Sequence, residues 1–110
     1  MRDDAGRLQD MLDAIDKIES YVGEDRNAYE NDELLQVWVI HHLQILGEAA
    51  NRISVELHES HPEVPWTKII GMRNILVHNY VGIDLNLVWQ VVEGDLPELR
   101  PKIERLLRDH

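Results

Sequence analysis

The sequence contains no cysteine and no apolar run longer than a few residues. The first absence excludes disulfide bonds, thiolate catalysis and cysteine-based zinc sites. The second argues against a transmembrane helix, and because no basic region followed by an apolar stretch opens the chain, no signal peptide is expected either. We therefore expect a cytoplasmic protein without a membrane partner.

The composition that remains predicts one folded domain over residues 1–110. The chain is 44% hydrophobic and 29% charged, which is ordinary for a globular protein and too apolar for a disordered one. A chain of this length is also too short to divide into two separate cores.

The formal charge of −10 argues at first against a nucleic-acid partner, because phosphate binding depends on basic surface. The acidity is uneven, however. Residues 1–35 carry eleven acidic and four basic side chains, whereas residues 41–82 carry four acidic side chains, three basic ones and five of the six histidines. The acidic run is typical of a solvated helical face, and a docking surface for a basic partner is the alternative.

Apolar residues in the first half recur at three- and four-residue spacing, which is the period of an amphipathic helix. They predict a helix over residues 3–22 that ends at Gly23, and a second, long helix from Asp32 to about Glu59. The polar connection between them could hold one helical turn. Gly47, Ala49 and Ala50 lie inside the long helix, where small side chains permit a neighbouring helix to approach closely.

Proline and capping residues divide the second half into further helices. Pro62 and Pro65 separate the long helix from one that starts at Trp66. Asp84 is placed to cap a short helix after the Gly82 turn, and Asp95 with Glu98 has the form of a capping box that opens a last helix to about Arg108. The prediction is an all-α antiparallel bundle of four to five helices.

The stretch "GMRNILVHNY", residues 71–80, places four polar residues inside an otherwise apolar helical pattern. Asn74 and His78 are four residues apart and share one face, so the amide could orient the imidazole. Arg73 and Tyr80 share another face. Arg73 and His78 are five apart, about 140° in angle and roughly 7.5 Å in rise, and they diverge on one straight helix. Either the helix breaks near His78, or an active site needs a second copy of the chain. A structural role for both residues is the alternative on spacing alone.

The whole chain resembles the HepT family of HEPN-domain toxins, the minimal nucleotidyltransferase-associated ribonucleases of prokaryotic toxin–antitoxin modules. The resemblance rests on "RNILVHNY", which fits the family pattern of arginine, a polar residue, three more residues, histidine, any residue and tyrosine. It is supported in order by "ILGEAANRIS", "PEVPWTKIIGMRN" and "VGIDLNLVWQVVEGDLPEL", and it covers roughly residues 7–107.

The resemblance implies an HEPN-type homodimer that acts as a metal-independent endoribonuclease, with the motifs of both chains lining one cleft. By position, Arg73, Asn74 and His78 match the catalytic motif, and Tyr80 matches the tyrosine that a partner nucleotidyltransferase adenylylates in some members. The implied setting is a type VII toxin–antitoxin module in which this chain is the toxin and the nucleotidyltransferase is the antitoxin. The cleft would hold RNA away from the acidic first helix, whose carboxylates repel it.

These residue types suit metal-free cleavage of RNA. Imidazole can take the proton from the 2′-hydroxyl or give one to the leaving oxygen, and two symmetry-related His78 side chains could do both. Arg73 offers a planar, permanently charged group for the phosphate. Arg52 and Lys68 are further possible RNA contacts.

Other readings of the sequence remain open. The histidine pairs at 41/42 and 58/61 lack the third and fourth ligands of a usual zinc site, so no metal and no cofactor are expected. Trp38, Trp66 and Trp89 are more typical of core or interface anchors than of base-stacking platforms. The alternative function is a non-catalytic helical module that binds a nucleotide or a nucleotidyltransferase.

Overall fold

The computed structural model describes residues 3–22, 26–78 and 82–109, and the side chain of His78 lies outside the described part. Within these ranges every regular element is helical, as the sequence predicts. None of the described helices is long and apolar enough to cross a membrane.

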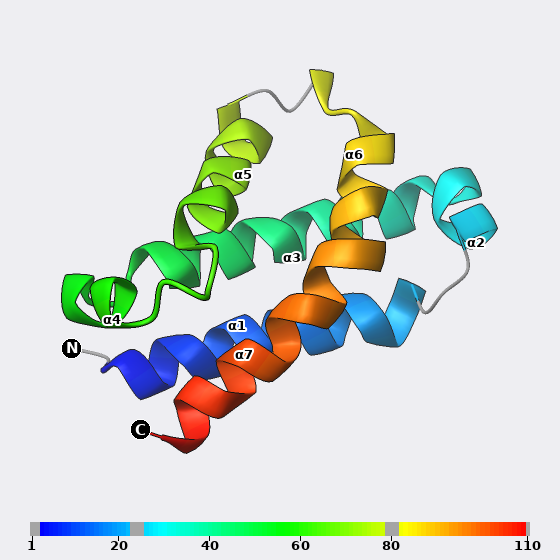
Figure 1. Cartoon of the computed structure of the whole chain (residues 1–110). Coiled ribbons are helices and arrows are strands. Elements are labelled where there is room, and N and C mark those ends of the chain that lie inside the picture. The colour runs from blue at the N-terminus through cyan, green and yellow to red at the C-terminus, as the bar shows by residue number, and fades with distance from the viewer. Residues whose placement is uncertain (1–2, 23–25, 79–81, 110) are drawn as a thin grey trace.

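Helices α1 and α3 form the centre of the molecule (Figure 1). They run antiparallel, because the Trp38 indole of α3 donates to the Lys17 carbonyl of α1 (3.1 Å) and Ser54, just beyond α3, bonds to Asp4 at the start of α1. Helix α5 packs on α3, and α7 packs on α1. The elements in chain order are α1 (Asp4–Val22), α2 (Arg26–Asn31), α3 (Glu33–Asn51), α4 (Val55–Ser60), α5 (Trp66–His78), α6 (Leu85–Gln90), the π-helical segment η2 (Val91–Asp95) and α7 (Leu96–Arg108).

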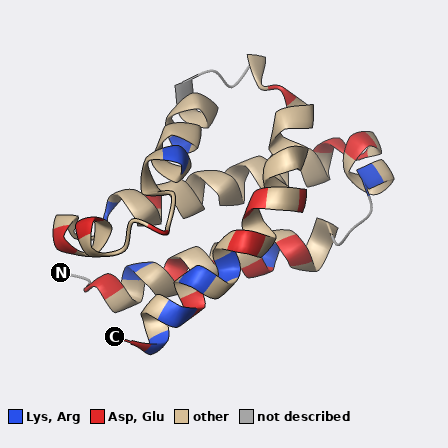
Figure 2. Ribbon diagram, viewed as in Figure 1, with Lys and Arg blue, Asp and Glu red and all other residues tan. Residues whose placement is uncertain are grey.

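The first helix follows the prediction closely. Its apolar stripe is fully buried at Leu8, Met11, Ile15 and Ile18, which pack in the core. The acidic residues on its other face are largely solvated, and Asp16 and Glu19 pair with Arg100 of α7. Figure 2 shows acidic residues along α1 and basic residues along α7. The acidic run therefore combines a solvated face with ion pairs to the last helix.

The prediction of one helix from Asp32 to Glu59 is wrong in its last third. Helix α3 ends at Asn51, and α4 begins at Val55. Ser54 explains the break, because its hydroxyl accepts from the Leu57 amide (3.2 Å) as an N-cap while donating to the Asp4 carboxylate (2.6 Å). Because the apolar pattern continues across Ser54, it gives no sign of this cap.

The capping box at Asp95 is also a wrong prediction. Asp95 has helical backbone angles and no side-chain cap, and the chain continues from α6 through η2 into α7. Pro97 supplies the physical reason for the π-helical segment, because proline cannot donate to the helix ladder and its ring crowds the carbonyl four residues earlier. Widening the preceding turn, where the Leu96 amide bonds to the Val91 carbonyl, relieves this conflict without ending the helix.

The tryptophans are mainly structural, as expected. Trp66 and Trp89 are buried, and each donates its indole N–H, Trp66 to the His61 carbonyl and Trp89 to Glu93. Trp38 is half-buried and packs against Tyr21 and His42.

Candidate active site

A shallow groove of about 350 Å³ lies where α1, α3 and α5 meet. Its lining residues are Arg7 and Asp10 from α1; His41, Gln44, Ile45, Glu48 and Ala49 from α3; and Arg73 and Val77 from α5. The groove contains the arginine of the motif helix. Helix α1 forms one of its walls, although its acidity predicts a position away from RNA.

A close helix crossing fixes the place of Arg73. A Cβ atom built on Gly47 would lie 2.2 Å from the Arg73 Cβ, so only glycine permits this approach of α3 to α5. The crossing is continued by Gln44, whose amide donates to the Leu76 carbonyl (3.3 Å). Positions 47 and 44 thus face 73 and 76, and the two helices run antiparallel. The predicted role of the small-residue segment is confirmed at Gly47.

Two neighbours hold the Arg73 guanidinium. Its Nη2 lies 2.9 Å from a Glu48 carboxylate oxygen, and its Nη1 donates to the Asn74 side-chain oxygen (3.0 Å). Guanidinium has five N–H donors, so three are left without a partner among the described residues. Arg73 is therefore oriented and still able to bind an anion.

Glu48 connects Arg73 to Arg52. Its other carboxylate oxygen accepts from the Arg52 Nε at 2.7 Å, one helical turn further along the chain. The hydrogen bond from Arg52, followed by the charges of Arg52 and Arg73, lowers the pKa of Glu48 below its usual range. The carboxylate is thus held in its charged form between two arginines.

The predicted site residues are brought together only in part. Arg52, Arg73 and Asn74 form one connected cluster through Glu48. The Asn74 side-chain oxygen accepts from Arg73. The predicted contact of Asn74 with the His78 imidazole involves a side chain outside the described residues. Helix α5 ends at His78, and the His78 side chain and Tyr80 both lie outside the described residues.

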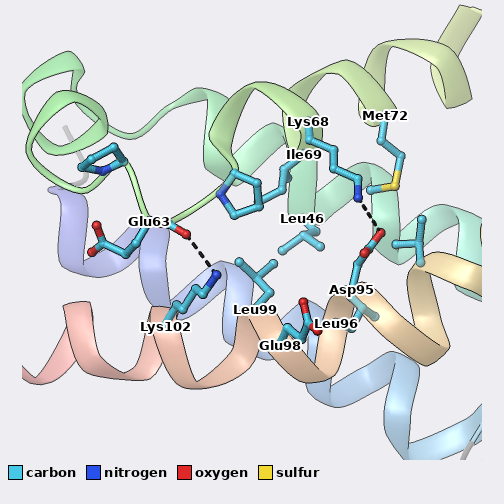
Figure 3. A pocket seen from close by; sticks show the side chains of 13 residues that line it. Leu46, Glu63, Lys68, Ile69, Met72, Asp95, Leu96, Glu98, Leu99 and Lys102 are labelled. Carbon is cyan, nitrogen blue, oxygen red and sulfur yellow. Dashed lines mark hydrogen bonds and ion pairs between the residues drawn. The ribbon is translucent and has the colours of Figure 1, made fainter.

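Lys68 lies on a different face of α5. It pairs with Asp95 (3.2 Å) at the mouth of a second cavity, of about 360 Å³, between α5 and α7 (Figure 3). Five residues separate Lys68 from Arg73, which turns them about 140° apart on the helix. Lys68 therefore takes no part in the groove around Arg73. Leu46, Ile69, Met72 and Leu99 are among the apolar residues that line this second cavity.

Sequence reasoning missed Glu48, Arg7 and His41 as members of the groove. The spacing of Glu48 and Arg52, four residues apart, predicts their ion pair but gives no sign of Arg73. Arg7 and His41 come from two other helices, and only the packing of α1 and α5 against α3 reveals them as neighbours. Ile45 is 37% exposed and faces the groove.

The charge of this region differs from that of the whole chain. Among the residues that line the groove, Arg7 and Arg73 stand against Asp10 and Glu48, so the lining has a formal charge of zero in a chain of −10. An exposed groove with an oriented arginine and no excess of negative charge can bind a phosphate group. Metal-free cleavage of RNA, the reaction expected from the sequence, also requires a group that accepts and donates a proton.

Comparisons with known proteins agree on one family. The family described as "Ribonuclease HepT-like" matches residues 11–106. The protein named "Putative RNase MJ1380" from Methanocaldococcus jannaschii is 39% identical over 104 residues, which cover 94% of this chain and 95% of the relative. "Probable ribonuclease HepT" from Thermococcus cleftensis is 37% identical over 102 residues, 90% of this chain and 91% of the relative. No solved structure matches.

Proposed function

The chain belongs to the HepT-like ribonuclease family, and from this premise we propose that it is a metal-independent endoribonuclease whose active site is the groove around Arg73. The observation that carries the proposal is the state of the Arg73 guanidinium. It is fixed by Glu48 and Asn74, it keeps three donors for a ligand, and it belongs to the helix that ends at His78. The substrate is RNA.

In the proposed reaction Arg73 binds the scissile phosphate and stabilises the charge that develops there. One His78 acts as the base and takes the proton from the 2′-hydroxyl, and the symmetry-related His78 acts as the acid and gives a proton to the leaving 5′-oxygen. The 2′-oxygen attacks phosphorus, the bond to the 5′-oxygen breaks, and the leaving oxygen receives a proton. Asn74 positions Arg73, and Arg52 holds Glu48 in place.

We propose that the active form is a homodimer in which the two motifs share one cleft. Exposed apolar side chains support this, because Leu34, Val37 and Ile45 lie on one stripe of α3 at 82%, 44% and 37% exposure. His41 lies on the same stripe and lines the groove, so it would face the cleft that the two copies share, and Val77 of α5 continues the stripe beside Arg73. A second copy placed there would cover the apolar stripe and bring a second motif close to the first.

The proposed biological setting is the toxin of a type VII toxin–antitoxin module in the cytoplasm. A cognate nucleotidyltransferase would serve as antitoxin by adenylylating Tyr80. The added phosphodiester and purine would occupy the space that the substrate phosphate needs, so modification would stop cleavage.

The activity is tested by incubating purified protein with RNA in the presence of a chelator. We expect cleavage that persists with EDTA, falls at least 100-fold in Arg73→Ala and His78→Ala, and is unchanged in Leu87→Ala, an exposed α6 residue outside the groove. Cleavage that vanishes with EDTA and returns with a divalent ion would overturn the metal-free mechanism. Absent cleavage with tight binding to the cognate nucleotidyltransferase would favour a non-catalytic binding module.

A further inference from the structure

His41 is an exposed side chain of the groove that the proposed reaction does not use. No hydrogen bond ties its ring to another described residue. Among the described residues its ring makes one aromatic contact, an edge-on approach to the His42 ring with centroids 5.0 Å apart. A polar group that lines a groove without a partner is free to bind a ligand there.

The orientation of His41 follows from its buried neighbour. His42 is 5% exposed, its Nδ1 is 2.8 Å from the Trp38 carbonyl, and its ring packs on the Trp38 indole with centroids 4.2 Å apart. This fixed ring stands edge-on to the His41 imidazole, at an interplanar angle of 89°. His42 therefore limits the positions that the His41 ring can take on that side.

His41 and Arg73 lie at different places along the groove. Arg73 is anchored at Glu48, and positions 41 and 48 are two turns apart on α3, roughly 10.5 Å along the axis. Because α5 runs antiparallel to α3, the direction from Glu48 to His41 is also the direction from Arg73 toward the end of α5. The groove thus holds one fixed cation, Arg73, beside Glu48, and a separate donor, His41, two helical turns away.

The charge around these two positions favours one class of ligand. Asp10 lies 3.8 Å from Arg7, and Glu48 is shared by two arginines, so each groove carboxylate already faces a cation. The remaining donors are N–H groups of Arg73 and Arg7 and the ring of His41. A ligand with acceptor groups at intervals, such as a single nucleic-acid strand, matches this arrangement.

We propose that His41 binds the phosphate of the nucleotide next to the one held by Arg73, so that the groove has a second phosphate subsite. The imidazole donates a ring N–H to a non-bridging phosphate oxygen; every protonation state of the ring has at least one such donor. This inference rests on the proposed function, because the strand that occupies the groove is the RNA substrate. It adds a contact on α3, a helix outside the motif.

The experiment uses uncleavable 2′-O-methyl oligonucleotides that each carry one neutral methylphosphonate linkage at a different position. Dissociation constants are measured by fluorescence anisotropy for the wild type, Arg73→Ala and His41→Ala. We expect one neutral linkage to weaken wild-type binding roughly 10-fold and to have no further effect in His41→Ala, because the contact is already missing. The neighbouring linkage should behave in the same way toward Arg73→Ala.

Three control variants separate a contact from a general effect on the protein. His61→Ala removes a histidine that pairs with Glu63 outside the groove, and it should retain the wild-type pattern. His41→Lys keeps a donor and should restore much of the affinity. His41→Gln, with a thermal melt, guards against loss of structure in the alanine variant.

Two outcomes overturn the inference: equal linkage penalties in His41→Ala and the wild type, or a wild type that binds none of the oligonucleotides. The proposed function is judged separately, from cleavage of ordinary RNA. Cleavage by the wild type without any coupling at His41 would refute the subsite alone. Coupling at His41 without cleavage would refute the ribonuclease alone.

Discussion

Gly47 of α3 lies directly against Arg73 of α5, and a Cβ on Gly47 would come within 2.2 Å of the Arg73 Cβ and 3.2 Å of the Ile69 carbonyl oxygen. The Arg73 Cβ and the Ile69 carbonyl belong to rigid parts of α5, so they cannot move aside as a flexible chain end could. The crossing therefore ties the position of the motif arginine to the absence of one side chain on another helix.

We expect Gly47→Ala to lower both stability and activity. The added methyl must push α5 away from α3, at a cost of about 1–3 kcal/mol in free energy of unfolding. Because Arg73 moves with α5, RNA cleavage should fall more than the folded fraction does. Chemical denaturation and initial cleavage rates measure the two effects.

Gly71→Ala is the matched control for this substitution. Gly71 lies in α5, and a Cβ there meets nothing within 4 Å. Alanine should raise the free energy of unfolding by up to about 1 kcal/mol through helix propensity, and cleavage should be retained. Equal losses in both variants would show that the two helices do not cross at Gly47 as described.

Glu48 is expected to position Arg73 without touching the substrate. In Glu48→Gln the guanidinium loses a charged partner, and we expect kcat to fall roughly 10- to 100-fold with little change in KM, because misplacement of a catalytic group mainly affects the transition state. Glu48→Asp should retain part of the activity. An unchanged kcat in Glu48→Ala would show that Arg73 is oriented without it.

The ion pairs of Glu48 should be lost at low pH. The pKa of Glu48 is lowered in the folded protein, so its ion pairs are present above the usual carboxyl range and are lost as the pH falls through the lowered pKa. Arginine side-chain NMR signals report this directly. We expect the Arg73 guanidinium signal to be distinct and slowly exchanging at neutral pH, and to lose that protection in acid and in Glu48→Gln. A signal that does not respond to either change would contradict the pairing.

The sequence predicted features that local residues determine better than the boundaries between consecutive helices. The α1 stripe and the Asp84 cap were readable because a periodic pattern and a single polar residue determine them locally. The break at Ser54 depends on Asp4, fifty residues away, and the continuation through Asp95 depends on a π-helical turn before Pro97. Neither dependence is visible in local sequence.

Some residues of the candidate site can likewise be predicted from local sequence, and others cannot. Arg73 and Asn74 were found because they lie in one short motif on one helix. Glu48, Arg7 and His41 were missed because their proximity to Arg73 arises from the packing of three helices. The Gly47 contact is an intermediate case, since a small residue inside a helix predicts a close crossing but not the residue that it meets.

We expect the free energy of unfolding to fall at alkaline pH because the buried Tyr29 hydroxyl ionises. It is 1% exposed, its hydroxyl donates to the Leu85 carbonyl (3.0 Å), and burial raises its pKa to about 12. A tyrosine in the unfolded chain titrates near 10. The stabilisation is therefore complete below about pH 10 and is lost as the pH rises toward 12, a change of up to about 2–3 kcal/mol.

Denaturant unfolding at several pH values between 9 and 12 measures this effect, at roughly one-unit steps around the two pKa values. Tyr29→Phe should be less stable at neutral pH, because it leaves the Leu85 carbonyl without its donor, and should lose much of the alkaline decline. Tyr21→Phe, at an exposed position, should decline like the wild type. A steep decline retained in Tyr29→Phe would exclude Tyr29 as its cause.

The shared site predicts that two inactive chains can complement each other. Arg73→Ala and His78→Ala should each be inactive, and a mixture that has exchanged subunits should recover part of the wild-type cleavage, because one mixed cleft holds one intact copy of each residue. Recovery should disappear when both chains also carry Ile45→Asp, which places a charge on the exposed α3 stripe. The same charge at Leu87, exposed on α6, should leave complementation intact. Full activity in a monomer at nanomolar concentration would contradict the shared cleft.

Modification at Tyr80 is expected to control the enzyme through occupancy of the groove. Co-expression with the cognate nucleotidyltransferase should add one or more adenylyl groups, detectable by intact-mass and peptide mass spectrometry, and cleavage should stop. Tyr80→Phe should escape the mass increase and, if it still cleaves RNA, should resist the partner enzyme.

The physical reason is competition, since an attached phosphodiester brings negative charge and a purine to the end of the motif helix, where the free Arg73 donors would otherwise meet the RNA phosphate. Arg73→Ala gives a further test, because it should accept the adenylyl group while losing the contact that the attached phosphate would occupy. Complete inhibition of protein whose Tyr80 remains unmodified would mean that the partner acts by docking alone, and modification would then be rejected as the means of control.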